Sequence, residues 1–368
     1  MPAVLLVTQD LMRAGAQRQC VELALGLRTR PGWRVEVAAL EPDGPLAAEL
    51  HAAGVTLHAC PRRWRWDLSP AGAIARLARD GRFDIVHTFL FLPNFYGRLA
   101  RLRHRHPVVI SSLRSTGIEG LPRYVAEVLM APLCDLIIAN SEAGRRDLVS
   151  RGVAARRIVV VRNGLDLDRF IALTPPPRRP DGTRWIGMVA HMEPRKDHAA
   201  LVEAFATLSR HHPEARLVLA GDGSRRRRIE ELVHARKLDG EIVLRGTVAR
   251  TEEIYAGLEV YVQASASQEG TSNSIIEAMA AGLPVVATDI GGNAETVRHG
   301  ETGLVVPPSN PGAIAEALGH VLDSPAEARV MGLAGRRRAL EMYTRDRMVG
   351  ATFAVYERTL GLAVEAFH

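Results

Sequence analysis

The chain has 368 residues, of which 47% are hydrophobic, 24% charged and 5% aromatic, and its formal net charge at pH 7 is +6. This composition excludes collagen, coiled coil and global disorder, and the length favours about two domains. No apolar run reaches the roughly 18 residues that cross a bilayer, and the apolar opening Met1–Thr8 lacks the basic lead of a signal peptide. Three distant cysteines, Cys20, Cys60 and Cys134, exclude a disulfide scaffold or zinc ribbon and favour the reducing cytoplasm.

Arginine supplies almost all of the positive charge. Of the 47 Lys and Arg residues, only Lys196 and Lys237 are lysine. A GC-rich genome that uses arginine wherever a cation is sufficient is the simplest explanation. If arginine is used wherever it is sufficient, each lysine becomes a candidate for a position that arginine cannot fill. The net charge indicates an anionic partner without choosing among nucleotide, nucleic acid and membrane.

Short aliphatic runs alternate with amphipathic stretches through the first half of the chain. The run Ala3–Thr8 predicts a buried parallel strand, and Gln17–Leu27 places its apolar residues on one helical face. This alternation predicts a doubly wound parallel sheet with helices on both faces. The further strands expected in chain order are Val35–Leu40, Val55–Leu57, Asp84–His87, Val108–Ser111, Asp135–Ala139 and Ile158–Val161.

The proline-rich stretch Thr174–Gly182 interrupts this alternation, because stacked prolines fit neither a helix nor a sheet interior. The alternation then begins again, and the C-terminal stretch Met342–Ala366 predicts one or two long helices. The strands expected in the second half are Trp185–Ala190, Arg216–Ala220, Ile242–Leu244, Val260–Gln263 and Pro284–Thr288.

The chain is therefore predicted to be an α/β protein with two domains. The first covers residues 1–172, a linker covers 173–183, and the second covers 184–344. A helix over about 345–368 is expected to pack back on the first domain. Ligands of such sheets bind at the carboxyl ends of the strands, so a cleft between the two domains is the expected site.

The glycine turn Gly221–Gly223 begins like a dinucleotide-binding fingerprint. Arg226 occupies the position of the third glycine, and the strand that should end in a ribose-binding acid ends in Leu244–Gly246. A tight turn between a strand and a helix explains this segment better than an NAD site.

The richest motif is Glu269–Pro284, in which small polar residues begin a helix at about Thr271. The start of this helix would present backbone N–H groups and a positive dipole, which suit a diphosphate. Glu269 lies just before the helix and Glu277 nearly two turns inside it, so the two carboxylates can face opposite ends of a ligand. Carboxylates suit vicinal hydroxyls, because each oxygen accepts more than one hydrogen bond. The alternative is an acid that complements the dipole, with a surface glutamate.

This segment resembles the E-x7-E motif of the retaining GT-B glycosyltransferases of glycosyltransferase family 4. The resemblance implies a GT-B fold of two Rossmann-like domains facing across a cleft. It extends in the family's order over nearly the whole chain. The other matching segments are the glycine loop Ala14–Gln17, the N-G-x-D turn Asn163–Asp166 with Phe170, the strand and loop Gly187–Asp197, and the turn Gly291–Glu295.

The resemblance implies a role for each matching residue. Glu277 would hold the ribose hydroxyls and Glu269 the hydroxyls of the transferred sugar. Lys196 would neutralise the leaving phosphate, where a fixed cation lowers the barrier. A solvated surface lysine is the alternative for Lys196. The remaining residues expected to hold the donor diphosphate are His191, Arg195, Asn273, Ser274 and, from the first domain, Gly15.

Two positions depart from the family's pattern. His191 stands where the family usually has arginine, whose permanent charge and forked shape suit phosphate better. Either Arg195 compensates, or His191 contacts phosphate in its protonated form. Phe89 stands where the family often has a second histidine, which leaves His87 as the imidazole expected to line the acceptor site. A buried histidine at the strand end is the alternative for His87.

A basic aromatic cluster precedes a helix of the first domain and suits a lipid headgroup interface. The resemblance adds that many such enzymes act on lipid-linked acceptors. The alternative is a solvated helix face with partly buried tryptophans, and the absence of a recognised module argues against nucleic acid. The cluster consists of Arg62, Arg63, Trp64, Arg65 and Trp66, and another helix adds Arg98, Arg101, Arg103 and Arg105.

The chain is thus predicted to transfer a sugar from a nucleotide diphosphate sugar, preferably a UDP-sugar, to a hydroxyl acceptor with retention. A lipid-linked or cell-envelope polysaccharide intermediate is the expected acceptor, and the inner face of a bacterial membrane is a possible location. No metal or other cofactor is expected, since no Asp-x-Asp stands in the motifs. The alternatives are a nucleotide-sugar epimerase on the same fold and a non-catalytic nucleotide-sugar- or membrane-binding protein.

Overall fold

The structure is a computed structural model that describes residues 1–102, 107–114, 121–173, 179, 181–267 and 269–362. The chain forms two compact units. Unit 1 comprises Met1–Asp166 and Tyr343–His368, and unit 2 comprises Leu167–Met342. Most of the predicted linker, residues 174–178 and 180, lies outside the described residues.

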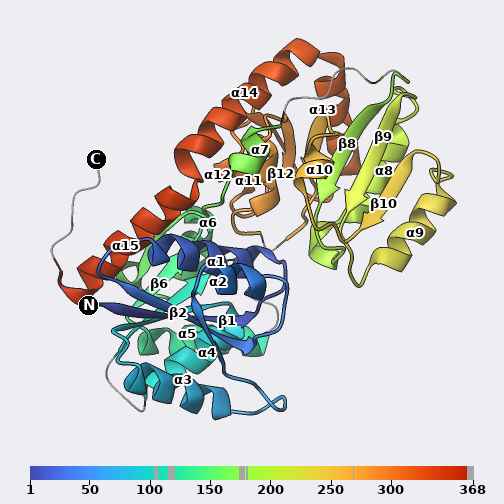
Figure 1. The fold of residues 1–368 in the computed structure, drawn as a ribbon. Coiled ribbons are helices and arrows are strands. Elements are labelled where there is room, and N and C mark those ends of the chain that lie inside the picture. The colour runs from blue at the N-terminus through green and yellow to red at the C-terminus, as the bar shows by residue number, and fades with distance from the viewer. Residues whose placement is uncertain (103–106, 115–120, 174–178, 180, 268, 363–368) are drawn as a thin grey trace. The chain divides into compact units, whose positions relative to one another are not determined.

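Unit 1 is built on a parallel sheet of seven strands in the order β3-β2-β1-β4-β5-β6-β7 (Figure 1). The strand order reverses between β1 and β4, which is the point where doubly wound sheets bind ligands at their carboxyl edge. The strands are β1 (Ala3–Asp10), β2 (Arg34–Glu41), β3 (Thr56–Ala59), β4 (Ile85–Phe89), β5 (Val108–Leu113), β6 (Leu136–Ala139) and β7 (Ile158–Val160).

Helices cover both faces of this sheet, as predicted. Successive residues of β1 point to opposite faces. Leu6 therefore joins the core beneath α1 and α15, whereas Leu5 joins the core beneath α3 and α4. The helices of unit 1 are α1 (Gly15–Arg28), α2 (Ala47–Ala52), α3 (Ser69–Asp80), α4 (Phe91–Arg101), α5 (Leu121–Met130), α6 (Glu142–Ser150) and α15 (Arg345–Leu360), with short 3-10 turns at Ala131–Leu133 and Ala155–Arg157.

The last described helix, α15, belongs to unit 1 although unit 2 precedes it in the chain. Phe353 and Tyr356 of α15 lie in the core beside α1, and the ring of Phe353 packs 5.0 Å from that of Trp33. Gly26 of α1 allows this approach, because a Cβ at this position would lie 2.3 Å from a methyl carbon of Val349.

Unit 2 is built on a second parallel sheet, in the order β10-β9-β8-β11-β12-β13. Its strands are β8 (Arg184–Val189), β9 (Ala215–Ala220), β10 (Ile242–Gly246), β11 (Val260–Gln263), β12 (Val285–Thr288) and β13 (Gly303–Val306). Its helices are α7 (Asp168–Ile171), α8 (His198–Leu208), α9 (Arg226–Ala235), α10 (Glu252–Tyr255), α11 (Asn273–Ala280), α12 (Asn293–Thr296), α13 (Pro311–Asp323) and α14 (Pro325–Met342), with a 3-10 turn at Pro194–Lys196.

Together the two sheets confirm the predicted α/β fold with two Rossmann-like domains. The sixth strand of unit 2, β13, is missing from the sequence prediction. It has four residues and begins at a glycine, so no periodic pattern marks it. Gly303 has φ +155°, and a Cβ there would lie 2.1 Å from the carbonyl oxygen of Val285.

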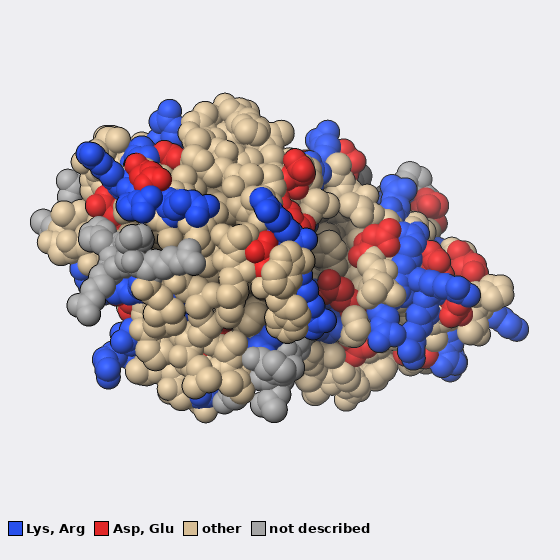
Figure 2. Space-filling model, turned by 90° about the horizontal axis from the view of Figure 1, so that it is seen from below, with Lys and Arg blue, Asp and Glu red and all other residues tan. Residues whose placement is uncertain are grey.

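Several arginines of this chain are paired with acids on the surface. Along α9, Arg226 bonds to Glu230 and Arg227 to Glu231, one helical turn apart. Figure 2 shows Lys and Arg side chains lying next to Asp and Glu side chains in the view from below. In the part of the chain that the structure describes, no helix is both long and apolar enough to cross a membrane.

We expect the buried ion pair of Arg98 and Glu127 to be essential for the stability of unit 1. Each side chain is 1% exposed, the ions are 2.5 Å apart, and Arg98 Nε also donates to Ser111 Oγ at 3.1 Å. Glu127→Ala should lower the free energy of unfolding by about 3–5 kcal/mol in urea denaturation, because Arg98 stays buried without its partner. The apolar pair Arg98→Met with Glu127→Leu should recover most of that loss. A loss below about 1 kcal/mol for Glu127→Ala would contradict a buried pair.

Candidate functional site at the carboxyl edge of unit 2

The predicted site residues of unit 2 gather where the strand order reverses, between β8 and β11. The loop after β8 carries His191, Arg195 and Lys196, and the loop after β11 carries Glu269. Because the carboxyl ends of parallel strands meet at one edge, Lys196 and Glu269 become neighbours although 73 positions separate them.

Backbone contacts fix both loops. The N–H of Met192 donates to the carbonyl of Asp222 at 2.9 Å, and the N–H of Ala266 donates to the carbonyl of Arg195 at 2.8 Å. The predicted tight turn at Gly221–Gly223 makes the first contact possible, because a Cβ on Gly221 would lie 2.0 Å from the carbonyl oxygen of Ala190.

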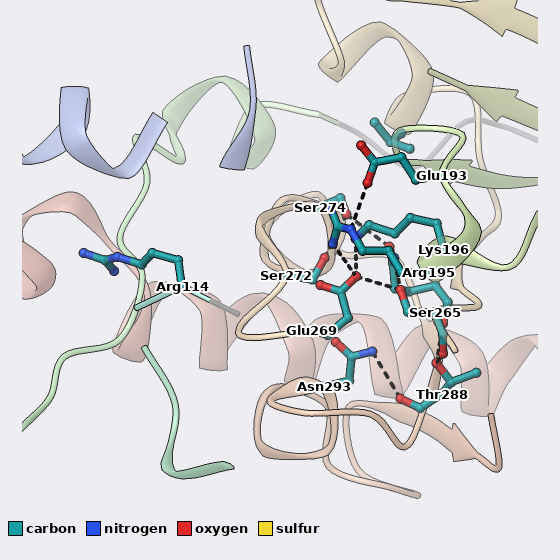
Figure 3. Close-up of polar contacts among 12 residues, drawn as sticks. Arg114, Glu193, Arg195, Lys196, Ser265, Glu269, Ser272, Ser274, Thr288 and Asn293 are labelled. Carbon is teal, nitrogen blue, oxygen red and sulfur yellow. Dashed lines mark hydrogen bonds and ion pairs between the residues drawn. The ribbon is translucent and has the colours of Figure 1, made fainter. Parts of the chain in front are cut away.

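Lys196 and Glu269 form the centre of the site (Figure 3). Lys196 Nζ bonds to Glu269 Oε1, and the two residues are only 8% and 5% exposed. Ser265 Oγ donates to the same carboxylate oxygen at 2.7 Å, and Arg195 lies 3.8 Å from it. Arg195 is also paired with Glu193 at 2.8 Å. The site therefore holds two cations and one buried carboxylate close together, which is a suitable setting for a ligand that carries both phosphate and hydroxyl groups.

The backbone around this pair is unusual. Asp197, directly after Lys196, has the left-handed φ of +48° and is the N-cap of α8, with its side chain accepting from the N–H of Ala200 at 3.2 Å. Ser309 Oγ donates to the other carboxylate oxygen at 3.0 Å. Non-glycine residues in this conformation persist where surrounding contacts hold them, often at functional sites.

A chain of buried polar side chains supports the carboxylate from below. Tyr261 OH donates to Gln263 Oε1 at 2.7 Å, and Gln263 Nε2 donates to Ser265 Oγ at 2.8 Å. Thr288 Oγ1 donates to the carbonyl of Ser265 at 2.6 Å. Ser274 Oγ reaches Gln263 Oε1 at 3.2 Å, so the first turn of α11 joins the same network.

Glu277 occupies a separate position, in the second turn of α11, whereas Glu269 lies in the loop before this helix. It is half-buried on α11, and Tyr255 OH donates to its Oε2 at 2.9 Å. Burial and the nearby Glu277 carboxylate raise the pKa of Tyr255 well above its usual value, so this phenol remains a hydrogen-bond donor. The carboxylate is thereby oriented while its second oxygen is left to other contacts.

The remaining predicted residues of the diphosphate site lie at the starts of loops and helices. His191 is exposed in the loop after β8, Asn273 is the first residue of α11, and Gly15 is the first residue of α1 in unit 1. The predicted helix start at about Thr271 lies two residues before the observed one. The contacts of these three residues with a diphosphate stay predictions.

His87 differs from the expected cleft residue. It is fully buried in unit 1, with Nδ1 2.6 Å from Tyr356 OH and Nε2 2.7 Å from Ser112 Oγ. Burial, together with the nearby charge of Arg114, holds its pKa well below the usual value, so the ring is neutral. These contacts are those of the alternative interpretation, a histidine buried at the strand end, and Phe89 stacks on it at 4.4 Å.

Sequence reasoning missed the supporting residues. Tyr255 lies 22 positions before Glu277, and Gln263 and Ser265 continue an ordinary strand, so nothing in their spacing marks them. Asn293 lies in the glycine turn that the sequence singled out, and its Nδ2 donates to the carbonyl of Thr288 at 3.1 Å.

Solved structures with the same pair of parallel sheets define the class of this chain as the GT-B fold. The Anabaena protein HepE, crystallised in complex with UDP, superposes with a TM-score of 0.84 at 19% identity, covering 98% of this chain and 100% of that one. Sucrose-phosphate synthase from Thermosynechococcus elongatus gives a TM-score of 0.82 at 23% identity, with the same coverage.

Sequence comparison places the chain within this class. The model of glycosyltransferase family 4 matches residues 13–169, and that of the glycosyl transferases group 1 matches residues 172–338. A D-inositol 3-phosphate glycosyltransferase of Kineococcus radiotolerans is 30% identical over 332 residues, which are 79% of this chain and 75% of that protein. The chain belongs to the glycosyltransferase family that these two models describe.

A second relative matches over a shorter stretch. An exopolysaccharide phosphotransferase of Streptomyces coelicolor is 32% identical over 212 residues, which are 56% of this chain. The match spans only 21% of that protein's length.

We expect the stability of unit 2 to depend on pH through His198, which lies two residues after Lys196 and is 2% exposed. Burial first, and the Lys196 charge second, lower its pKa to about 4. Between about pH 6.5 and 4 the unfolded chain binds the proton and the folded unit does not, so stability falls as the pH falls. The loss is about 3 kcal/mol.

The measurement is the urea midpoint of wild type and His198→Leu at several pH values from 7 to 4. In His198→Leu the slope of the unfolding free energy against pH should be smaller by the equivalent of nearly one proton. The control His234→Gln removes an exposed histidine and should leave the slope unchanged. An identical slope for wild type and His198→Leu would contradict the assignment.

Proposed function

We propose that the chain is a retaining glycosyltransferase that uses a nucleotide diphosphate sugar, preferably a UDP-sugar. The observation that carries the proposal is the buried contact of Lys196 with Glu269, with Glu277 held by Tyr255 farther along α11. This arrangement offers a cation for phosphate and two separate carboxylates for hydroxyl groups.

In the proposed reaction Lys196, assisted by Arg195, binds the diphosphate and stabilises the charge that develops as the sugar C1–O bond breaks. Glu269 accepts hydrogen bonds from sugar hydroxyls, and Glu277 accepts them from the ribose. The acceptor oxygen bonds to C1 on the face that the diphosphate leaves, and its proton passes to a phosphate oxygen. Because Lys196 and Glu269 contact each other, each must give up part of this contact in order to bind the substrate.

The donor and acceptor classes are proposed from similarity. HepE was crystallised with UDP, with UDP-glucose, and with UDP and glucose, which supports a UDP-sugar. We propose a glycan or lipid-linked acceptor of the cell envelope, which the relative named for exopolysaccharide chemistry supports. The relative named for glycosyl transfer to an inositol phosphate supports a smaller, phosphorylated polyol instead. We further propose that turnover requires no metal, with Lys196 and Arg195 supplying the positive charge.

We expect UDP to stabilise unit 2 and Glu277→Gln to abolish that effect, because the amide loses the charge and one acceptor. At a hundredfold excess over its Kd a ligand stabilises the native state by about 2.7 kcal/mol, or about 5–10 °C for a unit of this size. The measurement is thermal unfolding with UDP, GDP, ADP and dTDP and their sugars. The matched control is Glu230→Gln, which removes an exposed carboxylate of α9.

Two outcomes would contradict the proposal. A UDP shift that survives Glu277→Gln would move the nucleotide away from this helix. Consumption of a UDP-sugar without an acceptor and without release of UDP would indicate the epimerase alternative. Lys196→Ala should lower the transfer rate at least a hundredfold, measured at a temperature where the variant is still folded, because Glu269 stays buried without its lysine partner.

We also propose that the first unit binds an anionic membrane through the loop between β3 and α3. Trp64 and Trp66 in this loop are 60% and 70% exposed, and Leu68 is 55% exposed. Arg62, Arg63 and Arg65 are all exposed beside them, and the guanidinium of Arg65 lies 5.1 Å from the ring of Trp66. Exposed indole rings among cations suit the boundary between lipid headgroups and acyl chains.

The loop is held in this shape by a buried acid. Asp67 accepts from the backbone N–H of Arg63 at 2.9 Å and of Ser69 at 2.8 Å, and these bonds lower its pKa. Tyr96 OH donates to the carbonyl of Asp67 at 2.9 Å. The two tryptophans are therefore presented on a fixed turn, which lowers the entropy lost on binding. By contrast, Arg98 and Arg101 are occupied by ion pairs, and Arg103 and Arg105 lie outside the described residues.

We expect tryptophan fluorescence to shift to the blue with vesicles of phosphatidylcholine and phosphatidylglycerol, because two of the chain's four tryptophans would enter the headgroup region. Replacing both Trp64 and Trp66 by Ala should abolish co-sedimentation with these vesicles. Replacing the three arginines of the loop by Gln should weaken it about a hundredfold, at about 1 kcal/mol per cation. The control Val330→Ala with Leu333→Ala removes exposed apolar groups of α14 and should change nothing. Equal binding to neutral vesicles, or binding unaffected by the loop variants, would contradict the proposal.

A further inference from the structure

One cation of unit 1 lies half-buried without a carboxylate. Arg114 directly follows β5 at the carboxyl edge of the sheet, next to β4, where the strand order reverses. Within the described residues it forms no ion pair. Four other buried or half-buried arginines of this unit do form such pairs: Arg18 with Glu49, Arg98 with Glu127, Arg101 with Asp135, and Arg345 with Glu22.

The partners of Arg114 are neutral. Its guanidinium donates to Asn163 Oδ1 at 3.0 Å and to Ser112 Oγ at 3.4 Å, and it lies 5.2 Å from the ring centre of Phe89. Nε is buried and, among the described residues, has no hydrogen-bond partner. A guanidinium has five N–H donors, so the described residues use fewer than half of them.

The Arg114 guanidinium stays charged although its buried surroundings disfavour a charge. Burial lowers the pKa of Arg114 to about 10, so the group remains a cation at neutral pH. The titratable groups that interact with it are Cys20, Tyr356 and His87, and burial keeps His87 neutral. Burial raises the pKa of Cys20 to about 12 and that of Tyr356 well above its usual value, so both are neutral and neither compensates the charge.

The position of Arg114 is fixed from several sides. Asn163, which accepts from it, belongs to a turn whose next residue, Gly164, exchanges two hydrogen bonds with Gln19 of α1, at 3.0 and 2.9 Å. Ser112 Oγ, its other acceptor, is held by His87 at 2.7 Å. The buried His87 thus acts as a positioning residue for the surroundings of Arg114.

We infer that Arg114 binds an anionic phosphoryl group on the acceptor substrate. A half-buried, pre-oriented guanidinium with unused N–H donors matches the bidentate geometry of phosphate oxygens, and the anion would supply the charge that the surrounding residues lack. This inference rests on the proposed glycosyl transfer only in that the ligand is called the acceptor substrate. The anion site itself belongs to unit 1 and is tested without turnover.

The test is thermal unfolding of the full chain saturated with UDP, titrated with inorganic phosphate, glycerol phosphate, acetate and glycerol at constant ionic strength. Inorganic phosphate and glycerol phosphate should stabilise the protein, and glycerol should not. Arg114→Gln should weaken the apparent phosphate affinity about ten- to a hundredfold, the range for a lost charged hydrogen bond. Arg114→Lys keeps the charge without the fork and should lie between the two.

The matched control is Arg101→Gln, which removes a half-buried arginine of the same unit that is already paired with Asp135. It should keep the phosphate response of wild type. Loss of the response in both variants, or its survival in Arg114→Gln, would overturn the inference. So would a response to acetate equal to that to phosphate, which would indicate a carboxylate instead. A UDP shift that is retained in Arg114→Gln separates this outcome from failure of the donor site.

Discussion

The buried ion pair of Lys196 and Glu269 is the constraint on which the site of unit 2 depends. Two charges that are each less than one-tenth exposed are costly to remove from water, and they are tolerated only with close contact and further hydrogen bonds. Ser265 supplies one such bond, and the N–H of Ala266 fixes the loop that carries the lysine. The loops after β8 and β11 are therefore joined by charge as well as by backbone.

That constraint also limits how the site can work. A carboxylate that already accepts from Lys196 and Ser265 has fewer lone pairs for a ligand, and a lysine that is bound to it is partly neutralised. A ligand with both phosphate and hydroxyl groups can replace each half of the pair with an equivalent partner. A bare phosphate would satisfy only Lys196 and leave Glu269 buried beside a second anion. The pair thus favours ligands that carry hydroxyl groups next to phosphate.

The fold was predictable from the sequence to a large extent, because strands that are buried on both faces are continuous aliphatic runs. Prediction failed at β13, which begins at a glycine and whose two central residues are only partly buried. Sequence motifs also singled out Lys196 and Glu269, which the structure brings into contact, and Glu277, while the roles of all three in binding stay predictions. It could not find Tyr255 or Ser265, because their contacts with the two glutamates arise only when separate strands and helices come together. For His87, the alternation of side chains along β4 predicts which face of the sheet the imidazole lies on. It does not predict that α15 covers this face and buries the imidazole.

The arginine content of this chain changes how its charge is interpreted. A count of cations suggests a surface ready for nucleic acid or membrane, yet the ion pairs show that position, not number, carries the information. Arg226 and Arg227 neutralise acids on their own helix, and Arg98 is enclosed with Glu127. Arg114 differs because the groups around it are hydroxyl, amide and aromatic, which orient a guanidinium without cancelling its charge. Keeping a half-buried cation that no described carboxylate pairs with lowers stability, and a fold retains such an arrangement where an anion comes from a ligand.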